Sequence, residues 1–206
     1  MSSAPRRTSG TRVGGRSASV VERVLEAAAE ELGRVGFEAL RIDDVAVISG
    51  VNKTTIYRRW PAKADLLAAV LEKESFPVAM PNTGSLLEDL RAALRDLRTR
   101  LYTARERGVV RMLQAERAHP DVAPLVSKLR ANHAQTRREM FERAIARGEL
   151  PAATDAGLLV EFVTAPLISR IVHMGLEVDD HFIDALSAVI TAGATHATPA
   201  QTDKTG

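Results

Sequence analysis

The sequence contains no cysteine among its 206 residues. This absence excludes disulfides, thiolate metal ligands and cysteine nucleophiles, and it fits a reducing compartment. Aromatic residues make up only 4% of the chain, which argues against a β-sandwich. No uninterrupted apolar run approaches the roughly 18 residues of a membrane span, and acidic residues interrupt the segment after the basic start where a signal peptide would be apolar. We therefore expect a cytoplasmic protein that does not associate with a membrane.

The chain also lacks a large excess of either charge. Its 28 basic and 26 acidic residues leave a formal net charge of +2. Between positions 41 and 63, however, five basic residues stand against two acidic ones, so this short segment alone carries a net charge of +3. A local positive surface attracts a phosphate backbone, and we expect this segment, rather than the rest of the protein, to face nucleic acid.

Motifs of the common enzyme classes are missing as well. The sequence has no GxSxG, no phosphate-binding glycine loop and no HExxH, and its five histidines include no pair four residues apart. The adjacent carboxylates, such as Asp179 with Asp180, occur where a helix end would place acidic residues in any case. We therefore predict that the protein is not an enzyme and that it uses neither a cofactor nor a metal ion.

What the sequence does contain is a helical pattern along most of its length. Apolar residues recur at spacings of three and four, and no strand-like alternation interrupts them, which predicts an all-α fold of about nine helices. Ser19 with Glu22, and Ser85 with Glu88, match capping boxes that open two of the helices. The pattern predicts helices at about 19–36, 42–48, 53–59, 66–71, 86–101, 109–118, 121–147, 155–174 and 180–194.

Two short helices joined at Ser49-Gly50-Val51 form the most informative feature. A helix of seven residues is marginal by itself, because nucleation is costly, so a partner helix and an aromatic side chain such as Trp60 must hold it. With Ile56 turned inward, the polar residues of the second helix remain outside. This arrangement predicts a helix-turn-helix, whose second helix presents its first residues to base edges in the major groove. The alternative is a structural helical hairpin with a solvated basic face.

The side chains of the second short helix suit contact with DNA. A lysine reaches guanine or phosphate, threonine offers a hydroxyl and a methyl group, and a tyrosine hydroxyl can bind a phosphate oxygen. The expected DNA-contacting residues are Lys53, Thr54, Thr55, Tyr57, Arg58, Arg59 and Lys63.

The run DDVAVISGVNKTTIYRRWPAKADLL, residues 43–67, resembles the DNA-binding domain of TetR-family transcriptional regulators. By position, the helix that opens at Lys53 is similar to the recognition helix of that family. Thr55 and Tyr57 are similar to its phosphate or base contacts, and Lys63 to a phosphate clamp at the start of the fourth helix. The sequence departs from the family at Thr54, where many members have glycine, and at Arg41, where many have a Thr or Ser cap.

The resemblance also implies the organisation of the whole chain. It implies a homodimeric repressor of a palindromic operator, with a C-terminal helical domain that binds an unidentified small-molecule effector and dimerises through its last two long helices. Both of these helices carry apolar residues on more than one face, which independently indicates a covered surface. The expected divisions are a disordered basic tail at 1–16, a DNA-binding domain with its linking fourth helix at 17–74, an effector and dimerisation domain at 85–194, and a flexible tail at 195–206.

Candidate residues of the C-terminal domain fall into two groups. An effector pocket is expected to include Arg111, Met112, Gln114 and His173. The dimer interface is expected to include Phe162, Ile168, Ile171, Phe182, Leu186, Val189 and Ile190.

Two alternatives remain open at the level of sequence. The same fold could serve as an adaptor or dimerisation module that binds proteins rather than DNA, and the salt dependence of binding would separate the two functions. The arginine-rich residues at the start of the chain are either a solubilising segment or an arm that enters the minor groove.

Overall fold

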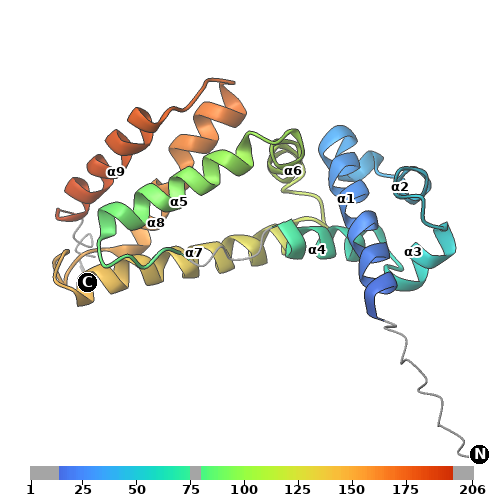
Figure 1. The fold of residues 1–206 in the computed structure, drawn as a ribbon, viewed down its shortest axis with the longest axis horizontal. Helices are drawn as coiled ribbons and strands as arrows, with labels where there is room; N and C mark the ends of the chain where they lie inside the picture. Colours follow the sequence, from blue (N-terminus) through green and yellow to red (C-terminus); the bar gives the residue numbers. More distant parts are fainter. Residues whose placement is uncertain (1–13, 75–79, 197–206) are drawn as a thin grey trace, which may run out of the picture.

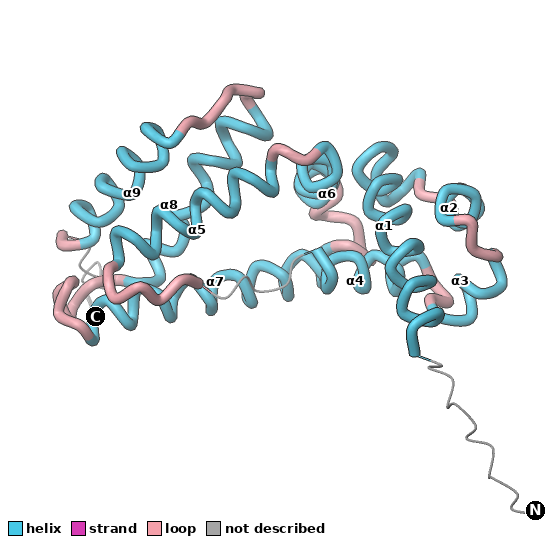
Figure 2. The backbone as a smooth tube through the Cα atoms, viewed as in Figure 1, coloured by secondary structure: helices cyan, strands magenta, loops and turns pink. Residues whose placement is uncertain are grey.

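The computed structural model describes residues 14–74 and 80–196 of the chain. Within these residues all regular secondary structure is helical, as Figure 2 shows, which confirms the predicted all-α fold. The helices are α1 (Gly14–Ala39), α2 (Ile42–Ser49), α3 (Lys53–Arg59), α4 (Lys63–Glu74), α5 (Leu86–Leu101), α6 (Ala104–Ala115), α7 (Ala123–Ala146), α8 (Ala156–Ile168) and α9 (Asp180–Ala194), with a π-helical turn at Ser169–His173 after α8.

Helices α1 to α3 lie at one end of an elongated molecule, and α5, α8 and α9 lie toward the other (Figure 1). Helix α1 packs against α2, α4 and α6. Helix α5 packs against α8 and α9, and α7 runs alongside α8. Helix α6 also packs against α5, and Val126 of α7 is in the same core as α1, so α6 and α7 both join the two ends.

Two hydrophobic cores correspond to this arrangement. The first core gathers the buried face of α1, including Ala28 and Leu32, with Phe37 and Ile56, and it also takes in Met112 of α6. The second core is built from α5, α7, α8 and α9. Because α6 contributes to the first core, the N-terminal helices do not pack independently of the rest of the chain.

The start of α1 differs from its predicted position. The helix begins at Gly14, so Ser19 is an interior residue and does not cap it. Of the expected tail at 1–16, only the last three residues are described, and they are helical; residues 1–13 and 197–206 lie outside the described part of the chain. Near the other end of α1, Gly36 has a φ of 82°, a left-handed conformation that glycine adopts without strain.

Helices α6 and α8 also differ from their predicted bounds. Helix α6 begins at Ala104 rather than near 109, because the Thr103 hydroxyl accepts a hydrogen bond from the Glu106 backbone N–H at 3.2 Å. Pro166, the predicted kink, lies inside α8 and removes one backbone donor. The chain then continues as the π-helical turn rather than as α-helix to Met174.

One stretch, residues 156–173, is long and apolar enough to cross a membrane by length and composition alone. It contains Glu161 and Arg170, and 39% of it is buried inside the single chain. A core helix of a water-soluble protein meets the same criterion, so this stretch is weak evidence for a membrane span.

Candidate nucleic-acid interface

The turn between α2 and α3 is fixed by Gly50. This residue has a φ of 64° and a ψ of 26°, and its N–H lies within hydrogen-bond reach of the carbonyls of Ala46 and Val47. A left-handed residue at this point ends a helix with its last carbonyls satisfied. The next residue, Val51, is buried, and its N–H donates to the Ser49 hydroxyl at 3.3 Å. The two helices are thereby held at a defined angle.

Helix α3 is stabilised at both of its ends. At the start, the Asn52 side chain accepts a hydrogen bond from the Thr54 backbone N–H at 2.8 Å. In the middle, Ile56 is completely buried against the first core, and Trp60 is buried just beyond the last turn. A seven-residue helix anchored in this way can present a rigid outer face.

That outer face carries the residues expected to contact DNA. Lys53, Thr54, Arg58 and Arg59 are exposed, and Tyr57 has 43% of its surface exposed. Thr55 is half-buried at the edge of the same face. The structure therefore brings the six candidate side chains of α3 together on and around one accessible surface.

The charge of this face is partly neutralised by α2. The Lys53 ammonium forms an ion pair with the Asp43 carboxylate, and it lies 5.7 Å from the centre of the Tyr57 ring. The hydrogen bond from Lys53 lowers the pKa of Asp43, and the same bond raises the pKa of Lys53. Both groups are therefore charged at neutral pH, and Lys53 must exchange this carboxylate for any phosphate or base that it binds.

Lys63 has backbone partners in the free protein. Its ammonium donates to the carbonyl oxygens of Phe37 at 3.2 Å and Glu38 at 3.0 Å, and it lies 5.2 Å from the centre of the Phe37 ring. The first residue of α4 is thus tied to the end of α1. An ammonium has three donors, so these two bonds leave one for a phosphate.

The same segment of α1 is tied to α6 from the other side. The Glu116 carboxylate accepts hydrogen bonds from the backbone N–H groups of Phe37 at 2.7 Å and Glu38 at 3.1 Å. The His119 ring packs edge-on against Phe37, and its Nε2 lies 3.1 Å from a Glu38 carboxylate oxygen. Phe37 and Glu38 therefore connect the end of α6 to the start of α4. No local sequence pattern indicates this junction, because its partners are 78 or 79 positions apart.

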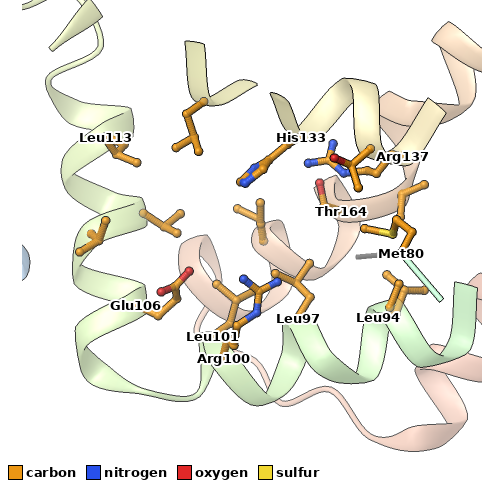
Figure 3. A pocket seen from close by; sticks show the side chains of 17 residues that line it. Met80, Leu94, Leu97, Arg100, Leu101, Glu106, Leu113, His133, Arg137 and Thr164 are labelled. Atoms are coloured by element: carbon orange, nitrogen blue, oxygen red, sulfur yellow. The ribbon is translucent and has the colours of Figure 1, made fainter. Parts of the chain in front are cut away.

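A cavity of about 170 Å³ lies between α5, α6, α7 and α8 (Figure 3). Its walls are mostly aliphatic, and its polar lining includes Glu106, His133, Arg137 and Thr164. A larger open cleft of about 640 Å³ adjoins it and shares several lining residues, including Arg137. A mostly apolar cavity with a few polar groups is the usual form of a small-molecule site.

The four residues expected in an effector pocket are divided by the structure. Gln114 and His173 line the open cleft and lie 2.8 Å apart, Oε1 to Nε2. Met112 is buried in the first core, and Arg111 donates to the Val172 carbonyl at 3.4 Å; neither lines the cavity or the cleft. None of the four lines the smaller cavity, and no motif in the sequence marks the residues that do, such as Arg137.

The seven residues expected at a dimer interface are also divided. Phe162 and Val189 are 56% and 69% exposed, and Phe182 and Leu186 are partly buried. Ile171 and Ile190 are only 2% and 5% exposed, so they belong to the core of the single chain and leave little surface for a partner. Ile168 lines the cavity.

Comparison with known proteins matches both ends of the chain to described families. Residues 24–70 match "Bacterial regulatory proteins, tetR family", and residues 80–190 match "Tetracyclin repressor-like, C-terminal domain". The HTH-type transcriptional regulator AqdR of Rhodococcus erythropolis is 28% identical over 186 residues, which cover 90% of each protein.

Two further relatives agree with these matches. The DNA-binding transcriptional repressor TetR of Mycobacteroides abscessus is 30% identical over 179 residues, which cover 83% of this chain and 94% of that protein. The solved structure of the TetR family transcription regulator SCO0332 superposes with a TM-score of 0.64 at 29% identity, covering 85% of this chain and 98% of that one.

Proposed function

This chain belongs to the TetR family of DNA-binding transcriptional regulators, and we propose that it is a cytoplasmic, homodimeric repressor of a palindromic operator that a small-molecule effector releases. The members of this family are transcriptional regulators, not enzymes. The observation that carries the proposal is the exposed polar face of α3, anchored by Ile56 and Trp60 beside the Gly50 turn.

In the proposed complex, α3 enters the major groove with its first turn toward the bases. Lys53 and Thr54, at that first turn, are placed to reach base edges, while Arg58 and Arg59 at the last turn contact phosphates. Tyr57 is on the same face as Lys53, one turn later, and its hydroxyl binds a phosphate. Lys63 adds a phosphate contact from the start of α4 with its remaining donor.

The proposed dimer forms through α8 and α9. Leu158, Phe162 and Ala165 follow one face of α8 and are exposed, as are Ala185 and Val189 on α9. Helices α8 and α9 pack against each other, and exposed apolar residues on two neighbouring helices of a water-soluble protein support burial by a second copy. A twofold dimer would present two α3 helices about 34–36 Å apart, or a multiple of that distance, to one side of a duplex.

The proposed effector acts by linkage. It must bind more tightly to a conformation in which the two α3 helices no longer match their half-sites, and the operator then disfavours effector binding by the same factor. Helix α6 supports this coupling, since Val109 and Leu113 line the cavity while Glu116 binds the backbone beside Lys63.

The salt dependence of duplex binding tests the DNA-binding role of Lys63. We expect a steep fall in affinity with salt, and Lys63→Ala should reduce the slope by about 0.9 per half-site because one phosphate contact is lost. Lys128→Ala removes the same charge from an exposed position on α7 and should leave the slope unchanged. An unchanged slope in Lys63→Ala would show that Lys63 makes no phosphate contact and serves only to bind the end of α1. If the affinity of the wild type for duplex DNA did not depend on salt, the protein would not be binding phosphates. That result would favour an adaptor that recognises proteins.

A further inference from the structure

Arg137 has an unusual position among the charged residues of this protein. It projects from α7 and lines both the cavity and the open cleft. Figure 3 shows its guanidinium on the same side of the cavity as His133 and Thr164, away from Arg100 and Glu106. A ligand that enters through the cleft therefore meets Arg137 before it fills the cavity.

No hydrogen bond or ion pair connects Arg137 to another residue in the described part of the chain. Arg100, the other arginine that lines the cavity, is paired: its Nε lies 3.1 Å from an Asp96 carboxylate oxygen. Burial lowers the pKa of Arg137, whereas the nearby charge of Glu161 opposes that shift. A partly desolvated guanidinium that makes no hydrogen bond or ion pair, and has only the nearby charge of Glu161, is a costly arrangement that a directly bound anionic ligand would relieve.

The other residues that line the cavity indicate that the rest of the ligand is apolar. Leu94, Leu97, Leu101, Val109, Leu113 and Val163 face the cavity with aliphatic carbon. Its volume of about 170 Å³ is close to that of an apolar cavity of about 150 Å³ that accepts benzene. The cavity therefore has room for one aromatic ring or a medium-length aliphatic chain, and the cleft has room for the attached polar group.

From this geometry we propose that the effector is an organic monoanion, with an apolar body in the cavity and a carboxylate, or a group of the same shape and charge, on Arg137. The inference rests on the proposed function for its regulatory meaning, but not for the binding itself. The other charged groups facing the cavity and the cleft are Arg100, Glu106, Arg130 and Glu161. Arg100 already has Asp96 as a partner, and Arg130 lines the cleft but not the cavity. Arg137, which lines both, is therefore the anchor for an anion whose apolar body fills the cavity.

The test measures binding of matched anionic and neutral compounds by isothermal titration. Benzoate, 4-phenylbutyrate and octanoate are each compared with the alcohol that carries the same apolar body. In the wild-type protein at least one of the three anions should bind at least about tenfold more tightly than its alcohol, because a hydrogen-bonded charge contributes on the order of one to two powers of ten. Equal binding of anions and alcohols, or no binding by any of the three anions, would overturn the proposal.

Three variants locate the anchor. Arg137→Gln should abolish the preference for the anion, whereas Arg137→Lys should keep part of it. Arg138→Gln is the matched control, because Arg138 is the next residue of α7, is exposed and lines neither the cavity nor the cleft. A preference that survives in Arg137→Gln, or that is lost equally in Arg138→Gln, would contradict the assignment.

Duplex binding without any ligand is measured on the same four proteins. All four should bind DNA alike, which also verifies that the variants are folded. If the wild type prefers anions but binds no duplex, the repressor proposal fails and the ligand class stands. If it binds duplex but shows no anion preference, the ligand class fails and the repressor proposal stands.

Discussion

Lys53 and Asp43 are paired across the two short helices in the free protein. Lys53 opens the helix that faces DNA, and Asp43 is in the first turn of α2, where its charge also suits the helix dipole. A lysine that enters a complex with DNA must give up this carboxylate. The pair therefore reduces binding to any duplex and favours those sites where Lys53 gains a better partner.

Replacing Asp43 tests this competition. Asp43→Asn should raise affinity for random duplex DNA by up to about fivefold per half-site, the range of an exposed ion pair. Asp44→Asn is the control, since it removes the same charge from the next residue, which forms no ion pair with Lys53 in the described part of the chain. Fluorescence anisotropy with labelled duplex measures both. Equal increases in the two variants would show that only the net charge matters.

At the scale of elements, the crossing of α1 and α6 depends on two glycines. A Cβ at Gly108 would lie 2.5 Å from the Cα of Gly33, and a Cβ at Gly33 would lie 3.0 Å from the Cα of Gly108. The two backbones are therefore in direct contact, and no side chain at either position could yield to an added methyl group. This contact joins α6, which helps to line the cavity, to α1, which packs against the helix-turn-helix.

Gly108→Ala should destabilise the protein relative to the wild type. Gly108 is inside α6, so the variant gains about 0.5–1 kcal/mol from the better helix former. The added methyl group overlaps the backbone of Gly33, and overpacking of this kind usually costs about 1–3 kcal/mol. Urea unfolding should therefore find a lower free energy of unfolding for Gly108→Ala than for the wild type. A variant that is as stable as the wild type would mean that α1 and α6 can move apart at this crossing without cost.

The sequence predicts best those elements that are determined locally. The end of α2 at Ser49-Gly50 and the span of α3 follow from a glycine turn, an Asn cap and a proline, all within a dozen residues. The start of α6 was missed because residues 104–108 carry charge instead of an apolar pattern, although Thr103 caps them. The cavity could not be predicted either, since nearly all of its lining comes from four different helices and Met112, expected there, is buried in the first core instead.

At the scale of the whole molecule, the exposed apolar residues of α8 and α9 are the test of dimerisation. Phe162→Glu combined with Val189→Glu would place two charges per subunit in the proposed interface. Sedimentation should then find a monomer, and operator affinity should fall by about 100-fold or more because the two half-sites are no longer bound together.

Met174→Glu provides the control for the interface variant. Met174 is as exposed as Phe162 but lies beyond the π-helical turn, in the segment before α9. This variant should remain dimeric and keep its operator affinity. A double variant that stays dimeric, or a Met174→Glu protein that dissociates, would place the interface elsewhere on the molecule.

The central claim is that two copies of α3 read a duplex together, and selection of bound sequences from random duplex DNA tests it most directly. The purified protein should enrich a palindrome whose half-site centres are about 10–10.5 base pairs apart, or a multiple of that spacing. Recovery of sequences with no shared motif, or of a single half-site without its inverted repeat, would contradict the account.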